Sequence, residues 1–150
     1  MIYSSLWAFF CAFGFGIIFN IKGKNLFFAS IGAFVGNIVF VLTKNITDSD
    51  IISYYFCAIS FSLLAEIFAI YRKIPVSIFL SPSMIPFVPG AAILSTMENL
   101  VEGNASQTWQ YGVYALQVSG AIAMGVITVS FVVKIWRNSI KKYFFKINGS

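Results

Sequence analysis

The sequence has no histidine and little charge of either sign. Only 10% of its 150 residues are Asp, Glu, Lys or Arg, whereas soluble domains carry about 25%. The absence of histidine removes the commonest general base and metal ligand. The two cysteines, Cys11 and Cys57, lie in apolar runs without CxxC spacing and are expected to be small core residues. Because paired acids and a nucleophile motif are missing as well, we expect neither an enzyme nor a site for a metal or a cofactor.

Apolar residues make up most of the chain, at 59% of the sequence with a mean hydropathy of +0.85. A chain of 150 residues is too short to cover that much apolar surface in a soluble core, so we expect one integral membrane domain over residues 1–150. The net charge of +5 does not indicate a nucleic-acid partner, because the bases form short clusters between apolar runs. The expected surroundings are therefore the lipid bilayer.

Charged residues divide the sequence into five apolar runs. Each run is close to the ~20 residues that a transmembrane helix requires, and the first lacks the basic start and the cleavage site of a signal peptide. We therefore predict an all-α polytopic membrane protein with about five transmembrane helices. They cover residues 2–21, 26–43, 51–71, 75–97 and 109–133, and a basic tail follows over residues 134–150.

The basic residues between these runs lie almost entirely on one side of the predicted layout. Lys44 is the only base on the other side. The positive-inside rule places the basic side in the cytoplasm, so we expect the N-terminus outside and the C-terminus inside. The bases on the cytoplasmic side are Lys22, Lys24, Arg72, Lys73, Lys134, Arg137, Lys141, Lys142 and Lys146.

The stretch of residues 81–90 places three prolines and a glycine inside an apolar run. Proline lacks the backbone donor and clashes with the preceding turn, so we expect no regular helix through this stretch. At membrane depth, irregular backbone is stable only when it is buried in protein or lines a watery cavity. Transporters form substrate sites near the bilayer midplane from such discontinuous helices. The fourth run is therefore predicted to be broken and to line a substrate path.

A second half-helix is expected to begin near Gly90, with Pro89 in its first turn, where a missing donor costs nothing. The free N–H groups of Ala91, Ala92 and Ile93 would then form a positive helix end suited to a substrate carboxylate. The alternative is a kinked or re-entrant structural helix that binds no ligand. The predicted substrate path comprises Pro86, Pro89, Gly90, Ala91 and Ala92.

Glu66 is the only acid inside an apolar run. An ionisable side chain within a membrane span is a functional candidate by default, and the hypothesis here is proton coupling. The alternative is structural, because Arg72 lies about 9 Å further along the helix and Lys73, seven residues on, returns to the same face. Glu66 would then be a neutralised or snorkelled carboxylate near the cytoplasmic interface.

Two asparagines and two sets of small residues complete the predicted intramembrane features. Asn20 closes the first run, and Asn37 follows a GxxxG pattern at Gly32 and Gly36. Such glycines let helices approach closely, and Asn37 could hydrogen-bond across the interface, although glycines also occur by chance in apolar helices. Small residues at helical spacing in the last run predict a packing face for another helix: Gly112, Ala115, Ser119 and Ala123.

The motif Ile-Pro-Phe-Val-Pro-Gly at residues 85–90 resembles the threonine/serine exporter family. The small membrane-only subunit of that family carries a Pro-x-x-Pro-Gly break in the corresponding span. Phe19-Asn20, the glycine-rich second run and Pro75 follow the order of the family, so the resemblance covers most of residues 10–100. Leu94 departs from it, because a tyrosine is expected a few residues after the glycine.

The resemblance implies a secondary exporter of small amino acids, of the threonine/serine type, in the cell membrane of a prokaryote. It also implies a companion subunit that carries the other membrane half, because family members occur either as one long chain or as two. A five-span chain that starts outside fits the second half of such an inverted pair. The alternative is a membrane scaffold or assembly subunit that does not transport.

Overall fold

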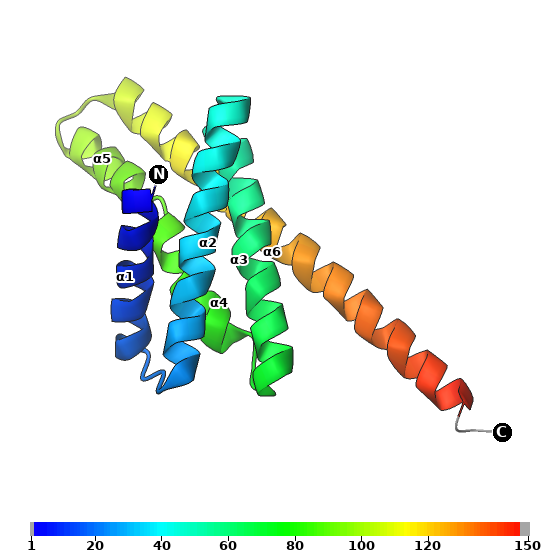
Figure 1. Cartoon of the computed structure of the whole chain (residues 1–150). Helices are drawn as coiled ribbons and strands as arrows, with labels where there is room; N and C mark the ends of the chain where they lie inside the picture. Colours follow the sequence, from blue (N-terminus) through cyan, green and yellow to red (C-terminus); the bar gives the residue numbers. More distant parts are fainter. Residues whose placement is uncertain (1, 148–150) are drawn as a thin grey trace.

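The computed structural model describes the backbone of residues 2–147 and the side chains of residues 2–137. Its regular elements are all helical, with no strand in the described residues, and the predicted all-α class is confirmed (Figure 1). The side chains of the predicted basic tail beyond Arg137 lie outside the described part of the chain. The helices are α1 (Ile2–Ile18), α2 (Lys24–Thr47), α3 (Asp50–Arg72), α4 (Ser77–Met84), the 3₁₀ helix η1 (Ile85–Phe87), α5 (Gly90–Val101) and α6 (Ala105–Ile147).

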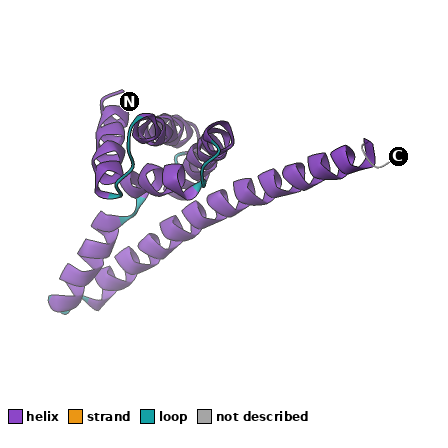
Figure 2. Ribbon diagram, turned by 90° about the horizontal axis from the view of Figure 1, so that it is seen from below, coloured by secondary structure: helices purple, strands orange, loops and turns teal. Residues whose placement is uncertain are grey.

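Helices α1, α2 and α3 stand side by side with alternating direction, and α4 packs against all three (Figure 1). The chain then leaves this bundle as α5, and α6 returns from the far end of α5 to cross α3 (Figure 2). Because α5 packs mainly against α6, the two form a hairpin that projects from the bundle. Beyond its crossing with α3, α6 continues away from the other helices.

The predicted layout of about five apolar segments is confirmed. Helices α2 and α3 and residues 105–137 of α6 are each long and apolar enough to cross a membrane. The stretch from α4 through α5 meets the same test as one segment bent by 50°. Helix α1 is apolar but has only 17 residues, so it is the shortest of the five segments.

Helix α1 ends at Ile18 rather than at residue 21 because of the backbone conformation of Asn20. Asn20 has a positive φ of 58°, and the N–H of Ile21 donates to the Gly16 carbonyl at 3.0 Å. The N–H of Asn20 itself donates to the Ile17 carbonyl at 2.9 Å. This pair of bonds is the Schellman motif, in which asparagine is the usual substitute for glycine. The exposed Asn20 side chain is therefore part of a helix end.

The glycines of α2 form a packing surface for η1. A Cβ at Gly36 would lie 3.3 Å from the Phe87 ring and 3.4 Å from the sulfur of the buried Cys57. Phe87 stacks on the fully buried Phe61, with ring centroids 5.6 Å apart and planes 7° from parallel. The GxxxG pattern thus lets a helix approach closely, as predicted.

Helix α6 meets α3 at Gly125. A Cβ at Gly125 would lie 2.6 Å from the Ala58 Cβ and 2.9 Å from the Tyr55 carbonyl oxygen. Two backbones can come this close only where one of them carries no side chain. The crossing therefore fixes where α6 lies on the bundle.

The small-residue face predicted for α6 is only partly covered. Ala115 is buried, and a Cβ at Gly112 would lie 3.5 Å from the Thr96 methyl group in α5. Ser119 and Ala123 are exposed. Within this chain the predicted face packs against α5 in its first half, while its second half stays open, because α6 turns a different face, with Gly125, toward α3.

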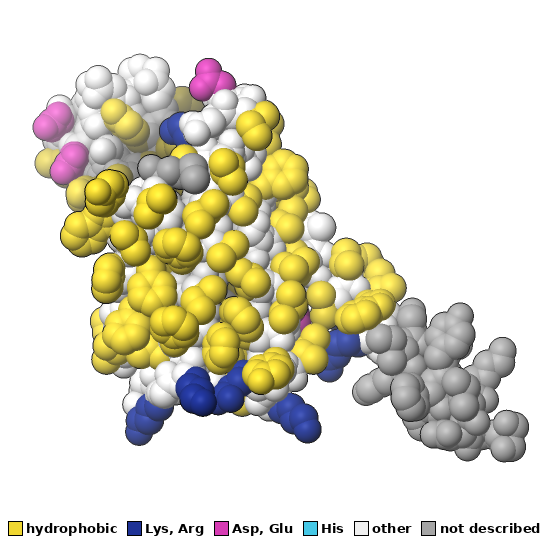
Figure 3. Space-filling model, viewed as in Figure 1, with side chains coloured by type: hydrophobic (Ala, Val, Ile, Leu, Met, Phe, Trp, Pro, Cys, Tyr) yellow, Lys and Arg dark blue, Asp and Glu magenta, His cyan; other side chains and the backbone are white. Residues whose placement is uncertain are grey.

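The charged side chains gather at the two ends of the molecule, with an apolar band between them (Figure 3). Lys22 and Lys24 lie where α1 leads into α2, and Arg72 and Lys73 end α3 on the same side. The alternating directions of the helices therefore place the described bases as the sequence predicts. The acids of the connections lie at the opposite end: Asp48, Asp50, Glu98 and Glu102.

Gly125→Ala should lower the unfolding midpoint of the protein in detergent, because the new methyl group would meet the backbone of α3. Overpacking of this kind costs about 1–3 kcal/mol. Gly120→Ala is the matched control, since nothing lies within 4 Å of a Cβ there and alanine favours a helix over glycine by up to about 1 kcal/mol. Thermal unfolding of the two variants beside the wild type measures the difference. Equal midpoints for the two variants would contradict the close crossing.

Candidate functional site

The observed break in the fourth segment covers Val88 and Pro89. Val88 is extended, with φ −61° and ψ 130°. Helix α5 begins at Gly90, as predicted. The segment bends by 50° across this point, so two non-helical residues turn the chain out of the bundle.

Helix α4 continues through Pro82, so the expectation of no regular helix from residue 81 onward is wrong. Pro82 removes the donor of one intrahelical bond only. The hydroxyl of Ser83 lies 2.7 Å from two carbonyl oxygens, that of Phe79 one turn earlier and that of Ala29 in α2. Pro82 itself is fully buried, and a proline is tolerated in a membrane helix where the neighbouring helices surround it.

The break begins at mid-height of the bundle. Gly32 of α2 faces α4, because a Cβ there would lie 2.6 Å from the Ser83 hydroxyl oxygen. One turn further along α2, Gly36 faces Phe87, the last residue of η1. Gly36 and Phe61 lie near the middle of α2 and α3. The chain therefore becomes irregular about halfway between the two charged ends.

The start of α5 differs from the prediction in two details. Pro89 precedes the helix and is not part of its first turn. The N–H of Ile93 donates to the Pro89 carbonyl at 3.1 Å, so it is not available to a ligand. In the part of the chain that the structure describes, the N–H groups of Ala91 and Ala92 have no backbone acceptor. The positive helix end is therefore confined to these two residues.

A cavity of about 430 Å³ lies beside the break and is here named the break cavity. Pro89 is buried in one wall, together with Met84 and Val88, and α6 forms the other wall. Ser119 contributes the one hydroxyl among its lining side chains. The lining residues of α6 are Ser119, Ile122, Ala123, Val126 and Ile127.

The structure brings only one residue of the predicted substrate path to the break cavity, namely Pro89. Pro86 is half-buried in η1, Gly90 and Ala91 are exposed, and Ala92 is buried. Sequence reasoning missed Ser119 as a site residue, because the small residues around it indicate helix packing. The signal in the sequence was that Ser119 carries the one hydroxyl among the small residues of the predicted packing face.

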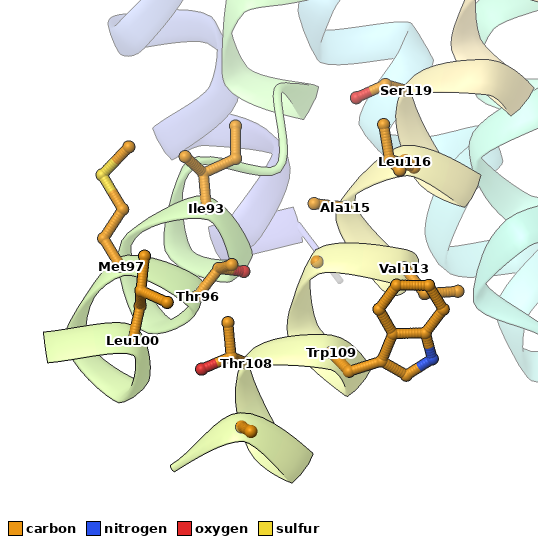
Figure 4. Close-up of a pocket in the computed structure, with 12 residues that line it drawn as sticks. Ile93, Thr96, Met97, Leu100, Thr108, Trp109, Val113, Ala115, Leu116 and Ser119 are labelled. Atoms are coloured by element: carbon orange, nitrogen blue, oxygen red, sulfur yellow. The ribbon is translucent and has the colours of Figure 1, made fainter. Parts of the chain in front are cut away.

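An apolar groove of about 580 Å³ lies between α5 and the first half of α6 (Figure 4). Two of its hydroxyls are bonded to their own helix: Thr96 donates to the Ala92 carbonyl at 2.7 Å, and Thr108 donates to the Asn104 carbonyl at 2.9 Å. Ser119 lines this groove as well as the break cavity. Both spaces therefore offer an apolar surface with one hydroxyl in common.

A third cavity, of about 800 Å³, lies at the basic end and is here named the basic-end cavity. Glu66 and Lys73 of α3 and Arg137 of α6 contribute charged side chains to its lining. Arg72, which the sequence offered as a partner of Glu66, instead donates from Nε to Asn25 Oδ1 at 2.9 Å. Within the described residues, Glu66 has neither an ion-pair nor a hydrogen-bond partner. No group of metal ligands occurs in the same part of the chain.

Asn37 makes the cross-helix contact that the sequence suggests. Its Oδ1 accepts a hydrogen bond from the Ser5 hydroxyl at 3.1 Å, which joins α2 to α1. Ser5 is fully buried and Asn37 is half-buried. The contact ties α1 to α2 one residue beyond Gly36, which faces Phe87.

A cluster around Asp50 at the acidic end was not predicted. Lys44 Nζ lies 2.8 Å from Asp50 Oδ1, and the Tyr114 hydroxyl donates to Asp50 Oδ2 at 3.1 Å. The carboxylate thereby joins α2, α3 and α6. Tyr114 lies far from Asp50 in the sequence, so no local pattern indicates the contact.

Comparison with known proteins places most of the chain in a family. The family model described as threonine/serine exporter, ThrE, matches residues 4–132. The matched stretch includes the break and every residue that lines the break cavity and the groove. No curated protein and no solved structure matches the chain.

Gly32→Ala should destabilise the protein, because the new methyl group would displace the Ser83 hydroxyl from the Ala29 carbonyl. The cost should be about 1 kcal/mol, as for one lost hydrogen bond. In a Ser83→Ala background the same change should cost much less, because the atom that it meets is gone. A double-mutant cycle on unfolding in detergent measures this coupling. An equal loss of unfolding free energy in the two backgrounds would contradict the contact between Gly32 and Ser83.

Proposed function

Because this chain belongs to the threonine/serine exporter family, we propose that it is a membrane subunit of a secondary exporter of small amino acids such as threonine and serine. The family and the apolar helices make it a multi-pass membrane protein of exporter type. The proposed substrates are the amino acids that the description of the family names.

The break at mid-height carries this proposal. It places irregular backbone beside a cavity at the depth where transporters bind substrate. The apolar wall of the break cavity suits a short side chain, and the Ser119 hydroxyl offers a donor for a carboxylate there. The N–H groups of Ala91 and Ala92, which follow the break without lining the cavity, would be further donors along the path. The proposed substrate path runs along Pro86, Pro89, Gly90, Ala91 and Ala92.

A companion subunit is part of the proposal, because this chain leaves the break cavity uncovered. Ser119 and Ala123 line that cavity and are exposed, and the hairpin of α5 and α6 projects from the bundle (Figure 2). A second membrane half in the opposite orientation would cover these surfaces, as in transporters built from inverted repeats.

The proposed orientation places the basic end in the cytoplasm and the N-terminus outside, in the plasma membrane of a prokaryote. The separation of charge in Figure 3 supports it. Lys44, the exception, is in an ion pair with Asp50, so the acidic end has little free positive charge.

Glu66 remains the proposed residue for proton coupling. It lies between the depth of the break and the basic end, and no described side chain neutralises it. A carboxylate in this position can bind and release a proton during the transport cycle.

The topology predicts which connections an impermeant thiol reagent reaches in intact cells. With Cys11 and Cys57 replaced by alanine, Ser49→Cys and Asn104→Cys should react from outside, because they lie between α2 and α3 and between α5 and α6. Lys22→Cys, between α1 and α2, should react only after the membrane is permeabilised. Equal labelling of Lys22→Cys and Ser49→Cys in intact cells would contradict the proposed orientation.

The double change Pro89→Ala, Gly90→Ala should lower amino-acid efflux about tenfold or more without lowering the amount of assembled protein. Alanine favours a helix over proline and glycine by roughly 3 and 1 kcal/mol in soluble hosts. The helix should therefore extend across the break and use the N–H groups that we assign to the substrate. The tenfold figure corresponds to one hydrogen bond to a charged group. Efflux from loaded vesicles is measured with the companion present.

Pro82→Ala is the control, because it changes a proline of the same segment inside α4 and away from the break. It should leave efflux near the wild-type value. Membrane abundance and companion pull-down are measured on the same preparations. Normal efflux from a normally assembled double variant would show that the break is not the site and would favour a scaffold. Efflux from vesicles that hold this chain alone would contradict the need for a companion.

A further inference from the structure

The basic-end cavity differs chemically from the other two spaces, because its lining carries charges of both signs. Glu66, Ala69 and Ile70 lie on one face of α3, at the spacing of successive helical turns, and Lys73 follows just beyond the end of the helix. The connection from α3 to α4 forms a second wall, and Trp136 with Arg137 of α6 forms a third. Its charged lining residues are one acid and two bases.

These three charges are unpaired with one another. The ion pair that the described side chains form is at the other end of the molecule, between Lys44 and Asp50. Lys73, just beyond the end of α3, and Arg137 are exposed, whereas Glu66 is half-buried. Glu66 is therefore the one of the three charges that lies in a partly apolar setting, where an unpaired carboxylate is costly and a cationic partner is favoured.

A free amino acid carries the complementary pair of charges, an ammonium and a carboxylate. A carboxylate binds an ammonium, and the two bases bind a carboxylate by charge-assisted hydrogen bonds. An anionic lipid headgroup suits the two bases but not Glu66, which would repel its phosphate. The composition of the cavity therefore favours a zwitterion over an anion.

The cavity lies at a depth between the basic end and the break. Phe61 of α3 stacks on Phe87 at the break, and Glu66 lies about 7.5 Å further along α3 toward the basic end. Lys73 lies at that end itself. A molecule bound in the cavity would therefore lie between the basic surface and the depth of the break.

We propose that the basic-end cavity is a loading site that binds the charged head of the exported amino acid before it reaches the break. Glu66 binds the ammonium, while Lys73 and Arg137 bind the carboxylate. Trp136 and the apolar wall of α3 lie beside the amino-acid side chain. This inference rests on the proposed function and adds a second binding position to it.

The test uses the complete exporter with its companion in vesicles, with efflux measured as a function of threonine concentration on the basic side. Glu66→Gln, Lys73→Gln and Arg137→Gln should each raise the KM for threonine about 10- to 100-fold, the effect of one hydrogen bond to a charged group. Arg72→Gln and Lys134→Gln are the matched controls, because they remove a base at the same end outside the cavity. The controls should keep the wild-type KM.

Threonine analogues that lack one charge separate binding from a structural role. Measured as inhibitors on the basic side, N-acetylthreonine, without the ammonium, and threonine methyl ester, without the carboxylate charge, should bind more weakly than threonine to the wild type. Glu66→Gln should lose the preference over N-acetylthreonine only. Lys73→Gln and Arg137→Gln should lose the preference over the methyl ester only. Arg137 is exposed, so its variant assembles even if a change in α3 lowers abundance.

Three results overturn the loading site. An equal rise in KM in the cavity variants and the controls would mean a general surface charge effect. Variants that change only the requirement for anionic lipid, compared in vesicles with and without phosphatidylglycerol, would make the cavity a lipid site. Wild-type efflux with unchanged KM and analogue preference in all three variants would remove the site but leave the proposed function. A wild-type assembly that moves neither threonine nor serine would overturn both.

Discussion

The contact between α2 and the stretch from α4 to η1 determines most of this structure. Two glycines one turn apart, Gly32 and Gly36, let Ser83 and Phe87 come within a few ångströms of the α2 backbone. In a bilayer, the lipid is as apolar as the side chains, so helices associate by close packing and hydrogen bonds rather than by the hydrophobic effect. This contact places the irregular residues that follow Phe87 at mid-height, with Pro89 buried and Val88 exposed. The same contact also directs α5 out of the bundle, and the direction of α5 sets the position of α6.

Charged residues are arranged differently at the two ends of the molecule. At the acidic end, Asp50 is bound by Lys44 and Tyr114 and ties three helices together. At the basic end, Glu66 and the bases near it stay apart and line a cavity. Paired charges of this kind stabilise a fixed arrangement, whereas separated charges can respond to a ligand or a proton. The same few residue types therefore serve assembly at one end and, in our proposal, binding at the other.

The sequence predicted the features that depend on local chemistry. Charge spacing and hydropathy are sufficient for the five segments, and the start of α5 at Gly90 follows from the backbone limits of Pro89. The helical course through Pro82 was not predictable, because Pro82 is fully buried among other helices and such tertiary packing leaves no local signal. The same holds for Ser119 in the break cavity. Its role depends on the crossing at Gly125, which sets the face that α6 turns toward the break.

Helix α6 is one continuous helix that borders three separate spaces. It packs along α3 with a buried stripe that includes Val118, Ile122 and Val129, and it comes closest to α3 at Gly125. Trp136 and Arg137 lie about 16–18 Å beyond Gly125 along the helix. The same helix therefore lines the groove beside α5, the break cavity and the basic-end cavity. Any change in the position of α6 on the bundle would alter the walls of all three spaces together.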